Sequence, residues 1–279
     1  MAMGIIEQLL HSTVRIECKL ANGDVEHGTG FFFNFPVGDI FIPVVVSNKH
    51  VVEGAITGSL IISTRDKDGV PDIINHKQIS VSNFENAWIP HPDNDVDLAV
   101  FPIGPLVNND DANGKTLFYI PLSVNLIPTK AQKDELSAME DVIMVGYPNG
   151  LWDSKHNLPV IRKGITATHC AKPFEGKLEF LTDIASFLGS SGSPVFLANI
   201  GGYIDASGAT VIGPNRIYLL GIHYGSAMQT TTGELQVVKS PTSTKTLSVT
   251  KIPMSIGVVI DSARILEFGS ILKKMADLK

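Results

Sequence analysis

The chain has 279 residues, of which 44% are hydrophobic and 18% charged, a balance typical of a packed globular protein and unlike that of a disordered chain. Its 22 basic and 28 acidic residues give a net charge of −6 without a long basic block, so we expect no nucleic-acid partner. The length allows one large all-β unit or two subdomains that share a cleft.

The cysteines and the N-terminal segment bear on the cellular compartment. Cys18 and Cys170 lie far apart with no Cys or His cluster beside them, which predicts small buried thiols and neither a disulfide framework nor a metal or other cofactor. Residues 1–17 lack a basic region followed by a sustained apolar run, and no later apolar run is long enough to span a membrane. We therefore expect a soluble, cytoplasmic protein without membrane contact.

Strand patterns dominate the chain from its beginning. Val14, Ile16, Cys18 and Leu20 alternate with polar residues, as expected for a half-buried strand. Further apolar runs, separated by Gly, Pro, Asn and Asp, predict strands over 28–35, 41–48, 59–63, 97–101, 141–148, 178–182, 193–198, 217–222 and 256–260. Many short strands with few helices indicate a sandwich or barrel.

Helical patterns are confined to two segments. The first is 129–141, between the two halves of the chain. The second is 261–279, where residues 265, 266, 268, 271, 272 and 275 form one broad apolar face, interrupted by Gly269. We expect this C-terminal helix to pack against the β-structure.

The stretch GSSGSPVF, which begins at Gly189, has the composition of a nucleophile loop. A serine hydroxyl needs a base to take its proton, and the oxyanion that forms needs donors already aimed at it. A tight turn can direct the N–H groups of Gly189 and Ser191 into one small space, while Gly192 avoids a Cβ clash. Ser193 stands where the nucleophile elbow of an α/β-hydrolase has its second glycine, so that alternative does not fit.

A base and its orienting carboxylate can be found upstream. His50 directly follows the apolar run 44–46, so it stands where a strand ends and a side chain can face a cleft. Asp97 directly precedes another buried strand and is the expected orienting carboxylate. Asp93 and Asp95 are close enough in sequence to be rivals, although they lack the same apolar context and are expected to cap the loop.

The blocks SNKHVV, DVDLAVF and TDIASFLGSSGSPVF, in that order, resemble the signature blocks of the chymotrypsin-like serine proteases, especially their HtrA-like, trypsin-like peptidase branch. GTGFFF and VGYPNG add to the resemblance, which spans residues 10–262. It implies an all-β fold of two six-stranded antiparallel β-barrels with a C-terminal α-helix. The expected N-terminal barrel, 1–125, carries His50 and Asp97, and the expected C-terminal part, 126–279, carries Ser191 and the helix.

The resemblance also implies a function and a role for each site residue. It implies a serine endopeptidase that hydrolyses peptide bonds of a protein or peptide substrate through an acyl-enzyme. Ser191 would be the nucleophile, His50 the general base and Asp97 its orienting group. The N–H groups of Gly189 and Ser191 would form the oxyanion hole.

Two departures from the family pattern bear on activation and specificity. Secreted trypsins have an aspartate before the nucleophile, and this aspartate forms an ion pair with the newly cleaved N-terminal amine. Ser190 stands at that position here and cannot form the ion pair. We therefore expect no activation by N-terminal cleavage, and an activating partner stays open. Ala185 stands at the floor of the pocket that takes the P1 residue, the residue before the cleaved bond. Arg and Lys are therefore disfavoured there.

His223 and Tyr224, in the segment GIHYGSA, are the expected wall of that pocket. In glutamate- or glutamine-selective relatives a histidine occupies this place, so Glu, Gln or small apolar residues are expected at P1. The alternative function is a protease-fold binding module that is catalytically silent or activated by a partner.

Overall fold

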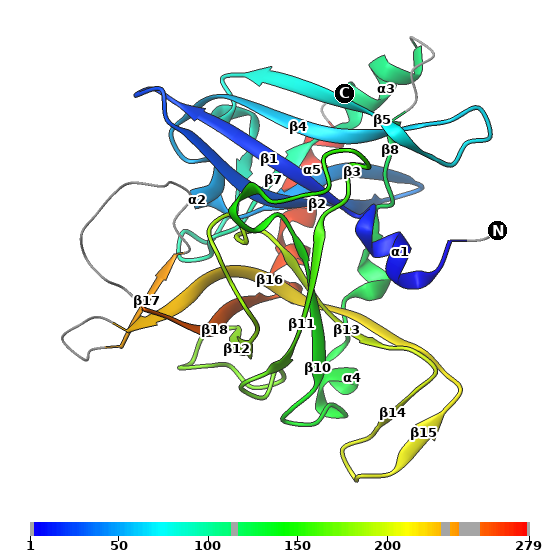
Figure 1. Ribbon diagram of the computed structural model, residues 1–279, viewed down its shortest axis with the longest axis vertical. Helices are drawn as coiled ribbons and strands as arrows, with labels where there is room; N and C mark the ends of the chain where they lie inside the picture. The colour runs from blue at the N-terminus through cyan, green and yellow to red at the C-terminus, as the bar shows by residue number, and fades with distance from the viewer. Residues whose placement is uncertain (1–2, 113–116, 230–234, 240–251, 278–279) are drawn as a thin grey trace.

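Two large β-sheets follow one another along the described part of the chain (Figure 1). The computed structural model describes residues 3–112, 117–229, 235–239 and 252–277. Within these ranges, the strands of the N-terminal sheet are β1 (Thr13–Leu20), β2 (Val25–Val37), β3 (Ile40–Ser47), β4 (Ala55–Arg65), β5 (Pro71–Ser82), β6 (Ile89–Pro90), β7 (Ala99–Pro102), β8 (Leu117–Phe118) and β9 (Leu122–Ser123). Their order is β5-β4-β1-β2-β3-β7-β6, with β8 beside β4 and β9 beside β2. Only β6, β8 and β9 among these described strands are two residues long.

The second sheet closes on itself. Its strands are β10 (Asp141–Gly146), β11 (Val160–Thr166), β12 (Glu179–Asp183), β13 (Pro194–Asn199), β16 (Arg216–Gln229), β17 (Leu235–Lys239) and β18 (Ile252–Asp261). The order β13-β10-β11-β12-β18-β16 becomes a six-stranded ring because β13 also pairs with β16, and β17 extends it from β16. A separate hairpin of β14 (Gly202–Ile204) and β15 (Thr210–Ile212) projects from this barrel (Figure 1). The all-β fold class predicted from the sequence is confirmed. The described pairings close the second sheet into a six-stranded ring, whereas the N-terminal sheet has nine described strands and its order ends at β5 and β6. We refer to these two sheets, each with the core packed on it, as the C-terminal and N-terminal barrels.

Helices are few and short. The α-helices are α1 (Ile5–Leu10), α2 (Lys49–Val52), α3 (Gly104–Ala112), α4 (Lys130–Asp134) and α5 (Gly269–Asp277). The 3₁₀ segments are η1 (Glu85–Ala87), η2 (Val124–Leu126), η3 (Pro148–Gly150) and η4 (Ser262–Phe268). The helix expected over 129–141 therefore ends at Asp134. Beyond it, the Glu140 N–H donates to Thr166 Oγ1 and the Glu140 carbonyl accepts from the Thr166 N–H, both at 2.9 Å, so these backbone groups pair with β11 and do not continue the helix.

Strand β2 joins the two barrels through its phenylalanines. Phe32 lies with Ile16 in the core of the N-terminal barrel. Phe31 and Phe33 lie in a second cluster, which includes Phe196 of the C-terminal barrel. Successive side chains of a strand point to opposite faces, so the run FFF fills both cores. Each buried phenylalanine contributes about 2–3 kcal/mol, and the shared cluster fixes one barrel against the other.

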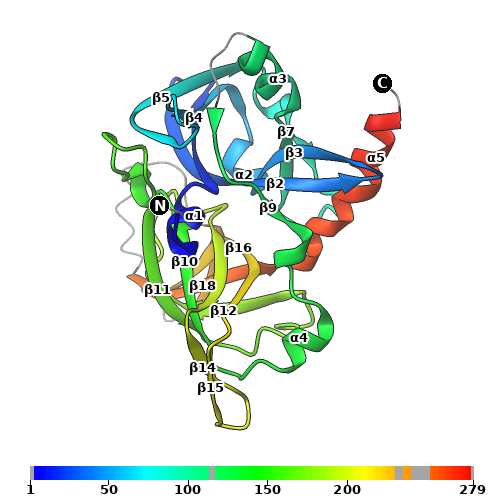
Figure 2. The same ribbon diagram turned by 90° about the vertical axis from the view of Figure 1, so that its right-hand side faces the viewer.

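The C-terminal segment crosses from one barrel to the other. Figure 2 shows η4 and α5 rising from the C-terminal barrel along the N-terminal one, and Phe268 and Leu272 are buried in the shared cluster. Packing against the barrels is confirmed, but Leu266 and Met275 are 45% and 43% exposed, contrary to the expected single face. The reason for Leu266 is that η4 is a 3₁₀ helix, whose three-residue turn places side chains differently from an α-helix.

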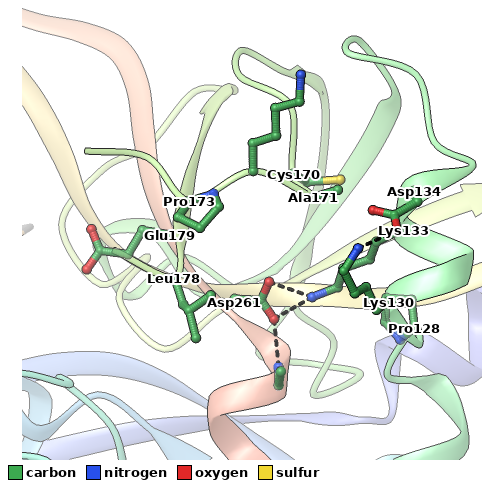
Figure 3. Close-up of a pocket in the computed structure, with 12 residues that line it drawn as sticks. Pro128, Lys130, Lys133, Asp134, Cys170, Ala171, Pro173, Leu178, Glu179 and Asp261 are labelled. Atoms are coloured by element: carbon green, nitrogen blue, oxygen red, sulfur yellow. Dashed lines mark hydrogen bonds and ion pairs between the residues drawn. The ribbon is translucent and has the colours of Figure 1, made fainter. Parts of the chain in front are cut away.

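A buried ion pair fastens α4 to the end of β18 (Figure 3). Lys133 Nζ donates to Asp261 Oδ1 at 2.6 Å and to Oδ2 at 2.5 Å. Asp261 Oδ1 also accepts from the backbone N–H of Ala263 at 2.8 Å and so caps η4. The carboxylate thereby fixes where the C-terminal segment leaves the barrel.

Both cysteines are buried and unpaired, as the sequence predicted. Burial raises the pKa of the Cys18 thiol to about 12 and that of Cys170 to about 11, so both stay protonated near neutral pH. In the part of the chain that the structure describes, no helix combines the length and apolar character needed to cross a membrane.

Candidate active site

The three residues expected to form a catalytic triad come from both barrels. His50 lies in α2, immediately after β3, and Asp97 precedes β7. The end of β3 lies beside the start of β7, because Ser47 pairs with Ala99. His50 and Asp97, which lie just beyond these two strand ends, are therefore close together. Ser191 precedes β13 of the C-terminal barrel. The cluster shared by the barrels therefore determines whether the three meet.

The side chains of these three residues are in hydrogen-bond contact. His50 Nδ1 lies 2.5 Å from Asp97 Oδ2, and the backbone N–H of His50 donates to Asp97 Oδ1 at 3.1 Å. His50 Nε2 lies 2.9 Å from Ser191 Oγ. All three residues are buried, with exposed fractions of 9% for His50, 7% for Asp97 and 0% for Ser191. Such an arrangement can pass a proton from the hydroxyl to the imidazole.

The rival carboxylates face elsewhere. Asp93 is exposed, and its Oδ2 accepts from Arg264 Nη2 at 2.6 Å. Backbone donation from Asp95 and the Arg264 guanidinium lower the pKa of Asp93. Asp95 is also exposed. Among the residues that the structure describes, Asp97 is the carboxylate in hydrogen-bond contact with His50.

The segment Gly189–Ser191 leaves two backbone donors free. The Leu188 carbonyl accepts from the N–H of Asn149. The described peptide bonds are all trans, so the Gly189 N–H points away from that carbonyl and from Asn149. Within the described ranges, neither Gly189 N–H nor Ser191 N–H has a hydrogen-bond acceptor. Both N–H groups are therefore unpaired donors in the described part of the chain.

Thr29 fastens this segment to the N-terminal barrel, and sequence reasoning assigned it no role. Its Oγ1 donates to the Gly189 carbonyl at 3.0 Å and accepts from the N–H of Tyr147 at 3.0 Å. Its backbone N–H donates to the Ser191 carbonyl at 2.9 Å. The available signal was the position of Thr29 between two glycines in GTGFFF, which allows the close approach of another backbone.

The residues expected to line a specificity pocket lie in three different settings. Ala185 is exposed, and the Tyr224 hydroxyl donates to Glu179 Oε2 at 3.0 Å. His223 is fully buried, and its Nε2 lies 2.6 Å from Ser186 Oγ. Ser186, which sequence reasoning missed, follows Ala185 directly. The Ser186 hydroxyl therefore connects the residue after Ala185 to the His223 imidazole.

The environment of His223 keeps its ring neutral. Burial, together with the nearby charges of Arg162 and His50, lowers the pKa of His223 from 6.5 to about 3. Its Nδ1 has no hydrogen-bond partner among the described residues. The ring can therefore orient the Ser186 hydroxyl but carries no charge at neutral pH.

This neutral ring should make stability depend on pH. The unfolded chain protonates His223 below pH 6.5 while the folded chain does not, so the free energy of unfolding should fall as pH falls from 6.5 towards about 3. The slope contributed by one proton is at most about 1.4 kcal/mol per pH unit. Urea unfolding between pH 7 and pH 4 should show His223→Gln losing up to about 3 kcal/mol less than wild type. Parallel losses in the two proteins would contradict this, and Ser186→Ala, which retains the ring, should behave as wild type.

Comparisons with known proteins found one matching family and solved structures of similar fold. The family described as "Trypsin-like peptidase domain" matches residues 28–202 of the chain. An HtrA-type protease, AlgW, solved with a tripeptide, has a TM-score of 0.51 and 14% identity, with 97% of this chain and 63% of that chain covered. The serine endoprotease from Yersinia pestis has a TM-score of 0.49 and 16% identity, with 97% and 66% covered.

The matched structures are longer than this chain and have low sequence identity to it. The chain spans 63% of the AlgW chain and 66% of the Yersinia pestis chain. At 14% identity, the likeness to AlgW bears on the fold alone, and it agrees with the two barrels described above. No curated protein matches the sequence.

Proposed function

This chain belongs to the trypsin-like peptidase domain family, and on that premise we propose that it is a serine endopeptidase that cleaves protein backbones through an acyl-enzyme. The observation that carries the proposal is the contact of 2.9 Å between His50 Nε2 and Ser191 Oγ, with Asp97 on the other ring nitrogen. We also propose that residues 1–125 and 126–279 are the two domains whose junction forms the active site.

The proposed reaction follows from these contacts. His50 Nε2 takes the proton of the Ser191 hydroxyl as Oγ attacks the scissile carbonyl carbon, and Asp97 stabilises the imidazolium. The oxyanion accepts from the N–H groups of Gly189 and Ser191, each worth about 3 kcal/mol in related reactions. The imidazolium then protonates the leaving amine, which departs and leaves the acyl group on Oγ. A water molecule repeats the attack with His50 as base and releases the acid.

Covalent labelling tests this proposal. A fluorophosphonate probe should label the wild-type protein at Ser191, since the probe needs an activated hydroxyl, and mass spectrometry should locate the adduct on that residue. Ser191→Ala should not be labelled. Ser193→Ala, which removes a nearby buried hydroxyl outside the triad, is the matched control and should be labelled. A folded wild-type sample that never reacts, alone or with lysate, contradicts the proposal.

One observation favours the alternative of a partner-activated module. Ser191 has no exposed surface, so a neighbouring group must move before a substrate can reach it. Labelling that appears only after lysate is added would support this alternative. Labelling of the purified chain by itself would contradict it, and we expect that result because the triad contacts are already formed.

The proposed P1 pocket has Ala185 at its floor, followed directly by Ser186, whose hydroxyl contacts the neutral His223 ring. Neither a carboxylate nor any other group in this set would balance the charge of an arginine or lysine side chain. We expect a peptide library to show Glu, Gln or small apolar residues at P1 ahead of Arg and Lys. Ser186→Ala should reduce the preference for Gln over Ala, because it removes the hydroxyl that His223 orients. A preference for Arg or Lys would contradict this pocket assignment.

A further inference from the structure

One arginine joins the two ends of the segment before Ser191. We call residues 185–190 the pocket loop. Arg162 lies in β11 beside it, and its Nη1 donates to the Ala185 carbonyl at 2.8 Å and to Ser190 Oγ at 2.8 Å. Ser190 Oγ in turn accepts from the N–H of Phe187 at 3.1 Å. A single nitrogen with two hydrogens thus connects the first and last residues of the pocket loop.

The Arg162 side chain is half-buried, and its guanidinium has few other partners. In the described part of the chain, Arg162 has no ion-pair partner, and its buried Nε and Nη2 have no hydrogen-bond acceptor. Burial lowers its pKa to about 10, so the group remains charged near neutral pH. Partial desolvation of a cation without a counter-charge is unfavourable, so an apolar side chain of similar size would lower the desolvation cost at this position. The contacts of Nη1 with the pocket loop are what distinguish arginine from such a side chain.

The pocket loop connects the proposed P1 pocket to the proposed oxyanion donor of Ser191. Its exposed end at Ala185 forms the floor of the proposed P1 pocket. Its other end leads directly to Ser191, whose N–H is a proposed oxyanion donor. Thr29 and Asn149 hold residues 188–191 from one side. The contacts of Arg162 restrain the other side, at Ser190 and Ala185.

We propose that Arg162 is a positioning residue, which clamps Ala185 to Ser190 and so keeps the pocket loop and the oxyanion donors in their reactive arrangement without N-terminal processing. This inference rests on the proposed protease function. The clamp is a hydrogen bond from a charged donor to a neutral serine, so it needs no free N-terminus and no carboxylate at position 190.

A double-mutant cycle between positions 162 and 190 tests the clamp. The four proteins are wild type, Arg162→Met, Ser190→Asp and the double variant. The rate of fluorophosphonate labelling is measured per folded molecule, with the folded fraction taken from circular dichroism. Arg162→Met should slow labelling about 10- to 100-fold, the size expected for losing hydrogen bonds from a charged donor. Lys163→Met, a neighbouring exposed cation on the same strand, is the matched control and should leave the rate unchanged.

The difference between the effects of Ser190→Asp on the labelling rate with and without Arg162 decides the outcome. With Arg162 present, the new carboxylate gains a cation, and labelling should stay within about threefold of wild type or rise. In the Arg162→Met background the same carboxylate is buried without a partner, and labelling should fall at least about tenfold further. Equal effects of Ser190→Asp in the two backgrounds would overturn the clamp.

A second measurement of the same cycle distinguishes failure of the clamp from failure of the proposed protease function. If wild type is not labelled, the protease proposal fails, but the same cycle measured on the free energy of urea unfolding still reports coupling between positions 162 and 190. Coupling in unfolding with none in labelling would overturn the positioning role. Coupling in both, with Arg162→Met folded at the assay temperature, is the expected result.

Discussion

Asp97→Asn is expected to lower kcat about 10⁴-fold while the protein stays folded. The reason is the orientation of the amide that replaces the carboxylate. Asp97 Oδ1 accepts from the backbone N–H of His50, so the amide oxygen should take that position and leave the NH₂ group facing Nδ1. Nδ1 must then accept, which places the ring proton on Nε2. An imidazole protonated at Nε2 cannot take the proton of Ser191.

Asp95→Asn is the control for Asp97→Asn. Asp95→Asn removes the same charge from an exposed position on the same loop and should leave kcat near wild type. Both variants are compared by steady-state hydrolysis of the best library peptide, with circular dichroism to confirm folding. A loss of less than about tenfold in Asp97→Asn would mean that Asp97 does not set the tautomer of His50.

Gly192→Ala is expected to reduce the free energy of unfolding by at least about 4 kcal/mol and to abolish labelling of Ser191. Gly192 has a φ of +83°, and an added Cβ would lie 1.9 Å from the Thr29 carbonyl oxygen. The glycine cannot move away easily, because its N–H donates to the His223 carbonyl at 2.9 Å. Thr29 would have to shift instead, and it holds both Gly189 and Ser191.

Gly176→Ala separates the steric contribution from backbone strain. Gly176 has a φ of +82°, nearly the same as Gly192, but no atom lies within 4 Å of its added Cβ. It should therefore show only the strain of the left-handed backbone, about 1–2 kcal/mol. Urea unfolding compares the two variants. Equal losses would mean that the close approach of Thr29 contributes nothing.

Strands with a strong apolar pattern could be predicted, and those without one could not. Each apolar run that predicted a strand overlaps one, because burial on one or both faces selects those residue types. The strand β5 was missed because it is largely polar and lies at the edge of its sheet, where its pairing with β4 defines it. The strand β11 was missed because Arg162 and Lys163 interrupt its apolar pattern, and its pairing with β10 and β12 makes it a strand.

The residue types and order of the proposed triad were readable from short segments, since strand ends and glycine-rich turns are local features. The meeting of His50 with Ser191, 141 positions apart, required the packing of one barrel against the other. The roles inferred for Thr29, Ser186 and Arg162 also required the folded chain. A hydrogen bond between distant segments depends on distances of a few tenths of an ångström, which arise from the packing of the whole core and leave no pattern in either segment.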